Sequence, residues 1–274
     1  MKRSWTLHPF FERAVKYPLL SALSFFMLLS VWLFLSTPLP RLTARTQPLV
    51  SPLFLPPIGK VLSDFLSPGI FSHLTISIFR TLTGVAIAAI LALILALIIS
   101  ASQTAEALVV PLSGLRYIPT PAFVPLTMLW VGIGEPQKLL IIGLGVFLQA
   151  LPLYVGALRS VEQNFIDIGS VYGLSRLQIA CRIRLLRALP AIYDSTRIVF
   201  GIGWACLLTA EIVGATRGLG FLITQSQRYL QTDVVFAAMT WVGLVGLLFD
   251  WSLIRLRCEA FPWDRHIFSD AANQ

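Results

Sequence analysis

Ionisable residues gather in one short stretch of an otherwise apolar chain. Residues 165–190 read FIDIGSVYGLSRLQIACRIRLLRALP and contain a single acid, Asp167, with four of the 21 basic residues: Arg176, Arg182, Arg184 and Arg187. Arginines placed in this way can lie on anionic lipid, bind nucleic acid or dock a protein partner. DNA binding is disfavoured, because the apolar runs on both sides would trap the element at a bilayer surface. The lipid and docking interpretations stay open on these residues alone.

Local signals predict that this stretch forms two short helices around a tight turn. Asn164 can cap the first helix, with Asp167 at its N3 position. Gly173 stands where a helix ends in the left-handed conformation, which glycine adopts without a Cβ penalty. Ser175 and Gln178 have the spacing of a capping box for the second helix.

Three further residues bear on the second short helix. Leu174 and Ile179 stand at its N′ and N4 positions and can form a hydrophobic staple. Pro190 is expected to mark the entry into the next apolar segment. A helix pair that is capped in this way is rigid enough to transmit force to a cytoplasmic partner.

Residue types that carry catalysis or bind metals are dispersed along the chain. The three cysteines and the three histidines show neither CxxC nor other ligand spacing, so no disulfide framework and no metal site are predicted. The phosphate-binding pattern G-x-x-x-x-G-K-[ST] does not occur. We therefore predict no catalytic residue and no cofactor in this chain.

Composition indicates an all-α protein that crosses a membrane several times. Of the 274 residues 56% are hydrophobic and 12% are charged, and the mean hydropathy is +0.79. A bilayer core of ~30 Å needs about 20 apolar residues per helix. Six spans are predicted at about Leu19–Ser36, Leu74–Ser100, Pro111–Val131, Lys138–Leu158, Ala191–Val213 and Val234–Leu256.

Three features of the spans are informative. The third is interrupted by Pro119, Pro121 and Pro125, so its backbone must be satisfied by protein or water. The first is long for a signal peptide and is expected to stay uncleaved. Between the first two, the run 58–66 is expected to form a short amphipathic helix on the outer surface.

Basic residues orient the spans. With the N-terminus inside, the cytoplasmic segments hold twelve basic residues and the outer segments five, as the excess of Lys and Arg in cytoplasmic loops requires. The same excess explains the net charge of +8 without nucleic acid. The predicted organisation is a cytoplasmic tail at 1–18, a membrane domain at 19–258 with a cytoplasmic loop at 159–190, and a cytoplasmic tail at 259–274.

Four ionisable residues lie in or near apolar segments, where charge is costly and suggests function. Arg80 can snorkel from the outer end of its span, and Arg197 can reach the cytoplasmic interface or pair with Asp194. Arg116 and Glu211 are the candidates for the translocation path. Glycines 214, 218 and 220 follow Glu211 and permit tight turns or a partly re-entrant segment.

The chain resembles the permeases of bacterial ABC importers, in the nitrate, sulfonate, taurine and bicarbonate branch. D-I-G-S-V-Y-G from Asp167, followed after nine residues by I-R-L-L from Ile183, is similar to their E-A-A-x3-G-x9-I-x-L-P signature. Asp167 stands for Glu, Ile168 and Gly169 stand for the two Ala, and Leu186 replaces Pro. The likeness extends over roughly residues 50–258 and includes RYIPTPAFVPLTMLWVGIG, LTAEIVGATRGLGFLI and QTDVVFAAM.

This resemblance implies a type I importer (MetI-like) permease fold in the bacterial inner membrane. It makes the loop a coupling helix, in which Asp167, Gly169, Gly173, Leu174 and Ser175 would engage a cytoplasmic ATPase. It also implies two ATPase subunits that bind ATP and Mg²⁺, a second permease copy in a homodimer, and an external solute-binding protein. The solute would be a small anion of the nitrate, sulfonate/taurine or bicarbonate class.

Two other functions compete with an importer subunit. An ion-coupled secondary transporter often shows two repeated halves, and no such repeat is visible here. An integral membrane enzyme would need clustered catalytic or ligating residues, which this sequence does not show.

Overall fold

The computed structural model describes residues 18–37, 48–102 and 110–264, and the regular structure in these ranges is helical throughout. The predicted tail 1–18 (apart from Pro18), residues 103–109 and the end of the predicted tail 259–274 lie outside the described residues. The chain divides into two compact units. One comprises Met1–Phe71, Leu222–Val245 and Pro262–Gln274, and the other comprises Ser72–Phe221 and Gly246–Phe261.

Four helices of the described residues are long and apolar enough to cross a membrane. They are α5 (Pro68–Ala101), α8 (Glu135–Arg159), the continuous run Arg176–Ile212 and α13 (Thr232–Ala260). They cover the predicted second, fourth, fifth and sixth spans. Where the first span is predicted, α2 (Pro18–Ser36) forms a 19-residue apolar helix.

The predicted third span is interrupted near its prolines, as the sequence indicates, and no continuous helix covers it. The chain forms the 3-10 helix η1 (Val110–Tyr117), the short 3-10 helix η2 (Thr120–Phe123) and then α7 (Val124–Val131). Pro119 precedes η2, and Pro121 lies in its first turn. The missing N–H groups and the restricted residues before each proline account for the interruption.

The boundary predicted at Pro190 is wrong. The helix that begins at Arg176 consists of α10 (Arg176–Ile179), a π-helical turn η3 (Ala180–Arg184) and α11 (Leu185–Ile212), which follow one another without a break. Pro190 is buried inside α11, as are Ala188 and Ile192. Packing of these apolar side chains outweighs the cost of a proline within a helix, roughly 3 kcal/mol.

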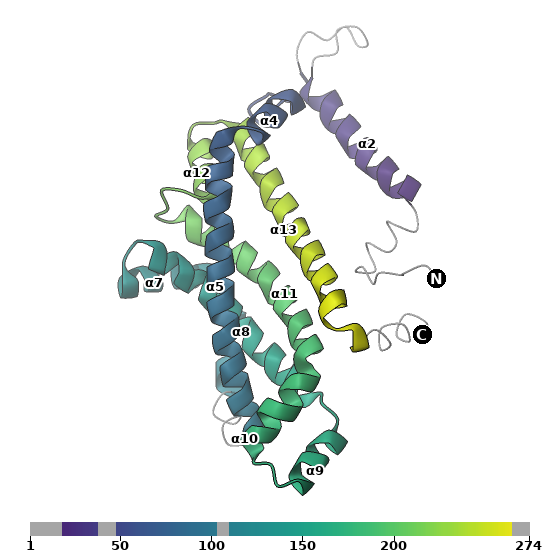
Figure 1. Cartoon of the computed structure of the whole chain (residues 1–274). Coiled ribbons are helices and arrows are strands. Elements are labelled where there is room, and N and C mark those ends of the chain that lie inside the picture. The colour runs from purple at the N-terminus through teal and green to yellow at the C-terminus, as the bar shows by residue number, and fades with distance from the viewer. Residues whose placement is uncertain (1–17, 38–47, 103–109, 265–274) are drawn as a thin grey trace. The chain divides into compact units, whose positions relative to one another are not determined.

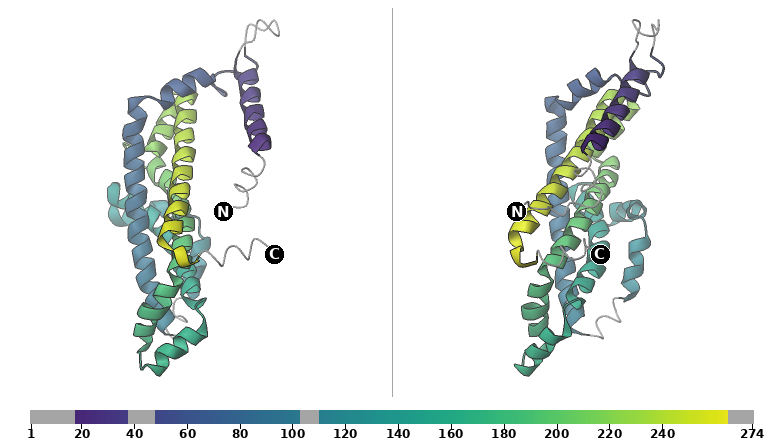
Figure 2. Two further views of the ribbon diagram at one scale, coloured as in Figure 1. Left: turned by 45° about the vertical axis from the view of Figure 1, so that its right-hand side comes forward. Right: turned by 90° about the vertical axis from the view of Figure 1, so that its right-hand side faces the viewer.

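Small residues let α5, α8 and α11 approach closely in the second unit, where Figures 1 and 2 show them running side by side. A Cβ added at Gly203 of α11 would lie 2.5 Å from Val85 Cγ2 of α5 and 2.9 Å from Val146 Cγ2 of α8. A Cβ at Gly145 of α8 would lie 2.5 Å from Cys206 Sγ of α11. Such contacts are typical of membrane helices, because lipid gives no hydrophobic reason to associate and packing must supply it.

The first unit contains the predicted amphipathic helix, α4 (Ile58–Phe65). The ring of Phe65 stacks on Trp241 with centroids 4.4 Å apart, and Trp241 Nε1 donates to the carbonyl of Phe65 at 2.9 Å. Trp32 Nε1 donates to the Pro56 carbonyl at 3.0 Å. Two indole donors therefore satisfy backbone acceptors around α4.

Candidate functional site

The first candidate site is the segment from α9 (Gln163–Val171) to α10, which lies at one end of the bundle of α5, α8 and α11 (Figure 1). The C-terminus of α9 is closed by a Schellman motif. The Leu174 N–H donates to the Gly169 carbonyl at 3.1 Å, and the Gly173 N–H donates to the Ser170 carbonyl at 3.0 Å. Gly173 has φ +73°, so the predicted left-handed turn is confirmed.

The start of α10 also agrees with the sequence. The Gln178 N–H donates to Ser175 Oγ at 3.3 Å, and the Ser175 N–H donates to Gln178 Oε1 at 2.9 Å. The predicted capping box is therefore present. Both residues of the predicted staple pack on Gly169, whose added Cβ would lie 3.3 Å from Ile179 Cγ1 and 3.6 Å from Leu174 Cδ1.

The predicted cap at the start of α9 is wrong. Glu162 is the N-cap residue and makes no side-chain capping bond, so Asn164 falls inside the first turn. Asp167 instead accepts a hydrogen bond from Gln163 Nε2 at 2.8 Å, one turn earlier on the same face. The helix starts two residues before the predicted point, and this shift removes Asn164 from the position where it could cap.

Gly169 and Ile183, two residues of the signature motif described above, lie against each other in the structure. A Cβ at Gly169 would lie 2.4 Å from Ile183 Cδ1. The small residue of α9 and the isoleucine of the π-helical turn are therefore in direct contact. Among the five predicted coupling residues, Asp167, Gly173 and Ser175 are exposed, Leu174 is half-buried and Gly169 is buried. The exposed three can therefore contact a partner, whereas Gly169 packs within the segment.

The surface beside the turn is apolar. Val171 is 86% exposed and Tyr172 is 81% exposed, with Ile168 and Leu177 more than half exposed nearby. Two arginines hold this segment against the bundle. Arg187 places its guanidinium 3.9 Å from the centroid of the Phe165 ring, and Arg184 Nη1 donates to the Ser100 carbonyl near the C-terminus of α5 at 2.6 Å.

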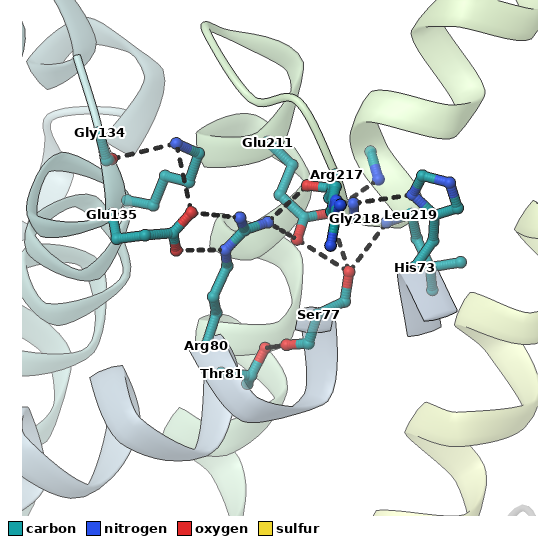
Figure 3. Close-up of polar contacts among 12 residues, drawn as sticks. His73, Ser77, Arg80, Thr81, Gly134, Glu135, Glu211, Arg217, Gly218 and Leu219 are labelled. Carbon is teal, nitrogen blue, oxygen red and sulfur yellow. Dashed lines mark hydrogen bonds and ion pairs between the residues drawn. The ribbon is translucent and has the colours of Figure 1, made fainter. Parts of the chain in front are cut away.

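The second candidate site is a buried ion-pair cluster around Glu211, shown in Figure 3. Glu211 is 0% exposed. Its carboxylate accepts hydrogen bonds from Ser77 Oγ at 2.8 Å, from Arg80 Nη1 at 2.8 Å and from the Gly220 N–H at 2.8 Å. The carboxylate therefore lies against the first turn of α12 (Leu219–Arg228), where free N–H groups and the helix dipole favour negative charge.

Arg80 lies at the centre of this cluster and is 4% exposed, so its predicted snorkelling is wrong. Its Nε and Nη2 donate to the two carboxylate oxygens of Glu135 at 2.7 and 2.5 Å, and Nη1 also donates to the Arg217 carbonyl at 2.7 Å. Arg80 stays buried because acids from two other helices, Glu135 and Glu211, pair with it. The spacing of these three residues in the sequence does not predict that they meet.

The loop after α11 folds over Glu211. Gly214 and Gly218 have φ of +69° and +121°, as in the tight turns that the sequence permits there, whereas Gly220 lies in the first turn of α12. A Cβ at Gly218 would lie 2.2 Å from Glu211 Oε1, so only glycine fits both the backbone angle and the space. The Gly218 N–H donates to His73 Nδ1 and the Leu219 N–H donates to Ser77 Oγ (Figure 3).

Arg116 lies apart from this cluster, at the end of η1. Its Nη2 donates to the hydroxyl of Tyr117 at 2.9 Å, and its guanidinium lies 4.9 Å from the centroid of the same ring. Gln149 Nε2 approaches the Arg116 carbonyl at 3.4 Å. Within the described ranges Arg116 forms no ion pair with an acid. Its place on the translocation path, like that of Glu211, stays a prediction.

The predicted pairing of Arg197 with Asp194 is wrong. Arg197 pairs with Asp250 of α13, with Nη2 3.0 Å from Oδ2, whereas Asp194 pairs with Arg257 of α13 at 2.5 Å. Both pairs join α11 to the part of α13 in the same unit. Sequence reasoning missed Asp250, Glu135 and Lys138, although an acid inside the apolar run 234–256 was a visible signal.

Comparisons with known proteins decide the family. The family model described as binding-protein-dependent transport system inner membrane component matches residues 91–256, more than half of the chain. The chain belongs to this family. It is also 33% identical over 231 residues to the taurine transport system permease protein TauC of Escherichia coli (strain K12), a match that covers 81% of this chain and 84% of that protein.

Other relatives agree with this assignment. The permease is 35% identical over 199 residues to the putative aliphatic sulfonates transport permease protein SsuC of Escherichia coli (strain K12), covering 71% of this chain and 74% of the relative. A chain from the inward-facing MetNI methionine ABC transporter superposes with a TM-score of 0.56 at 19% identity, covering 72% of this chain and 96% of that one. The fold is MetI-like, and the permease is the transmembrane subunit of an ABC importer.

Proposed function

We propose that this permease imports a small sulfonate, of which taurine is the simplest candidate, from an external binding protein into the cytoplasm. The observation that carries the proposal is the identity to TauC, 33% over 81% of this chain and 84% of that protein. The likeness to two SsuC proteins, at 34% and 35% identity, supports the wider sulfonate class. Nitrate and bicarbonate are the other members of the predicted anion class.

In this proposal ATP and Mg²⁺ are bound and ATP is hydrolysed by partner ATPase subunits. Two copies of the permease form a homodimer, and the segment α9–α10 of each copy contacts one ATPase. Exposed Val171 and Tyr172 offer the apolar anchor that the core of a docking surface needs. Exposed Asp167 and Ser175 lie on either side of them in the sequence and supply polar contacts at the rim.

The proposed orientation places α9, α10 and both termini in the cytoplasm. This orientation is supported by the count of basic residues, which is twelve in the cytoplasmic segments and five in the outer segments. The opposite end of the second unit, with Glu211 and Arg80, then faces the outside, where the binding protein would deliver its solute.

Uptake is the direct test of the proposed function. The permease, its ATPase and its binding protein are expressed together in cells that lack other taurine and sulfonate permeases. We expect uptake of radiolabelled taurine or an alkanesulfonate that stops when the ATPase is inactivated. Uptake that needs no ATPase and follows the proton gradient would identify a secondary transporter, and preferential uptake of nitrate would reject the sulfonate class.

Arg116 provides a second prediction. If its charge attracts the anion along the path, Arg116→Lys should keep more transport than Arg116→Gln, because the charge matters there more than the planar fork. The measurement is the initial rate of solute uptake, corrected for the amount of assembled complex. Tyr117→Phe, which removes the hydroxyl bonded to Arg116 but keeps the ring, is the matched control. Equal rates for the lysine and glutamine variants would remove Arg116 from the mechanism.

A further inference from the structure

The guanidinium of Arg80 contacts two carboxylates that differ sharply in exposure. Its Nη1 donates to Glu211, whose side chain is 0% exposed, whereas its Nε and Nη2 donate to Glu135, whose side chain is 60% exposed. One side of the Arg80 guanidinium is therefore paired with a fully buried carboxylate. The other side is paired with a carboxylate that is exposed to solvent, and Figure 3 shows both contacts.

The charges beside Nε and Nη2 of Arg80 need a neighbouring anion, whether Glu135 or another group supplies it. Lys138 is 3% exposed, and its Nζ lies 3.9 Å from Glu135 Oε1 and 3.0 Å from the Gly134 carbonyl. Arg80 and Lys138 carry two positive charges and Glu211 carries one negative charge, so without Glu135 these buried groups keep one positive charge. An uncompensated buried charge is costly, and an anion from solution can compensate it as Glu135 does.

The geometry of this side of the guanidinium selects the kind of anion. The Nε and Nη2 donors lie side by side and bind two oxygens of one group in parallel, which suits carboxylates, sulfonates and other forked oxyanions better than a spherical halide. Glu135 is the first residue of α8 and follows Gly132 and Gly134, so it lies next to backbone of low steric restriction. Because the Glu135 side chain is 60% exposed, its carboxylate has solvent beside it into which it can move away from these donors.

We propose that Arg80 and Lys138 form an exchange site for a small oxyanion, in which Glu135 is the resident occupant that the solute displaces. Glu211 does not exchange: it holds Arg80 in place from the buried side. In the native permease Glu135 therefore acts as an intramolecular competitor that keeps the site filled while solute is absent.

The position of the site fits the entry of solute. Arg80 and Ser100 lie in the same helix, α5, and twenty residues of helix span on the order of 30 Å, the thickness of a bilayer core. Ser100 is bonded to Arg184 beside the coupling segment, so the exchange site lies at the other end of the unit. This inference rests on the proposed function for both the outward orientation of that end and the anionic solute.

The test measures anion binding by the purified permease in detergent and needs neither the ATPase nor the binding protein. Sodium methanesulfonate is titrated against the parent and Glu135→Gln, and binding is read from the thermal unfolding midpoint and tryptophan fluorescence. We expect the apparent Kd to be roughly tenfold lower for Glu135→Gln, because the variant lacks the competing charge-assisted hydrogen bonds. Sodium chloride at equal ionic strength should not reproduce the effect.

Matched variants make the result specific. Glu259→Gln removes another exposed carboxylate, one that lies 4.0 Å from Arg255, and should leave the Kd at the parental value. Glu135→Asp keeps the charge but withdraws the carboxylate by one methylene, and should give an intermediate Kd. It serves as the second variant where Glu135→Gln does not purify as a folded protein.

Three outcomes would overturn the exchange site. They are equal affinities in the parent and the Glu135 variants, an equal response to chloride, or a gain confined to short-chain phosphatidylglycerol, which would indicate a lipid site. Failure of the proposed function is distinguishable from these. Taurine uptake without a gain in anion affinity rejects the exchange site alone, whereas a gain in affinity without uptake of any sulfonate supports the site and rejects the solute.

Discussion

Replacing Arg80 by methionine should destabilise the permease by about 3–5 kcal/mol, the usual effect of removing one partner of a buried ion pair. Methionine preserves much of the length of the side chain but leaves the fully buried Glu211 without its counter-charge. It also removes the donor to the Arg217 carbonyl and so loosens the loop before α12. The measurement is equilibrium unfolding of the purified chain in mixed detergent micelles.

Two further variants control this result. Arg255→Met removes an exposed arginine 4.0 Å from Glu259 and should cost no more than about 1 kcal/mol. Adding Glu211→Gln to Arg80→Met should recover part of the loss, because a neutral amide can still accept from Ser77 and the Gly220 N–H. If Arg80→Met and Arg255→Met unfold alike, the cluster does not stabilise the fold as we infer.

Gly173→Val should leave the chain inserted in the membrane but abolish most of the ATPase stimulation caused by loaded binding protein. The residue has φ +73°, and an added Cβ would meet no atom within 4 Å, so the effect comes from backbone strain alone. That strain costs about 1–3 kcal/mol for a β-branched residue. Relief of this strain would disturb the two hydrogen bonds that close the C-terminus of α9 and with them the turn that leads to α10.

The measurement for Gly173 is ATP hydrolysis and solute uptake by the reconstituted complex. Gly173→Asn should be milder, because asparagine tolerates the left-handed region better. Gly156→Val is the matched control: this exposed glycine of α8 also has no atom within 4 Å of an added Cβ, but its backbone is helical. Parental coupling in Gly173→Val would show that the angle between α9 and α10 is not what the ATPase recognises.

Local chemistry made the coupling segment predictable. The left-handed Gly173 and the capping box of Ser175 and Gln178 depend on residues no more than a few positions apart, so their geometry follows from the sequence alone. The start of α9 was not predictable to the residue. Asn164 is the better N-cap by residue type, yet α9 begins at Gln163 after Glu162, whose side chain makes no capping bond.

Hydropathy determined which segments form the long helices, because about 20 apolar residues have few alternatives to a membrane helix. It did not determine where those helices begin. Pro190 looked like a boundary, yet burial of its neighbours in α11 keeps the helix continuous from Arg176. The prolines near residue 120 do interrupt the helical structure. Proline type alone therefore does not decide where a helix ends, because packing can outweigh its cost, as it does at Pro190.

The sequence by itself therefore determined the class of the protein, which segments form its long helices, and the turn that faces the ATPase in our proposal. Each of these depends on composition or on neighbours along the chain. Only the tertiary structure decided the partners of the buried charges. Arg80 meets Glu135 and Glu211, which are 55 and 131 residues away, and Arg197 meets Asp250 rather than the nearby Asp194. An ion pair depends on the distance between charges in space, and helix packing sets that distance.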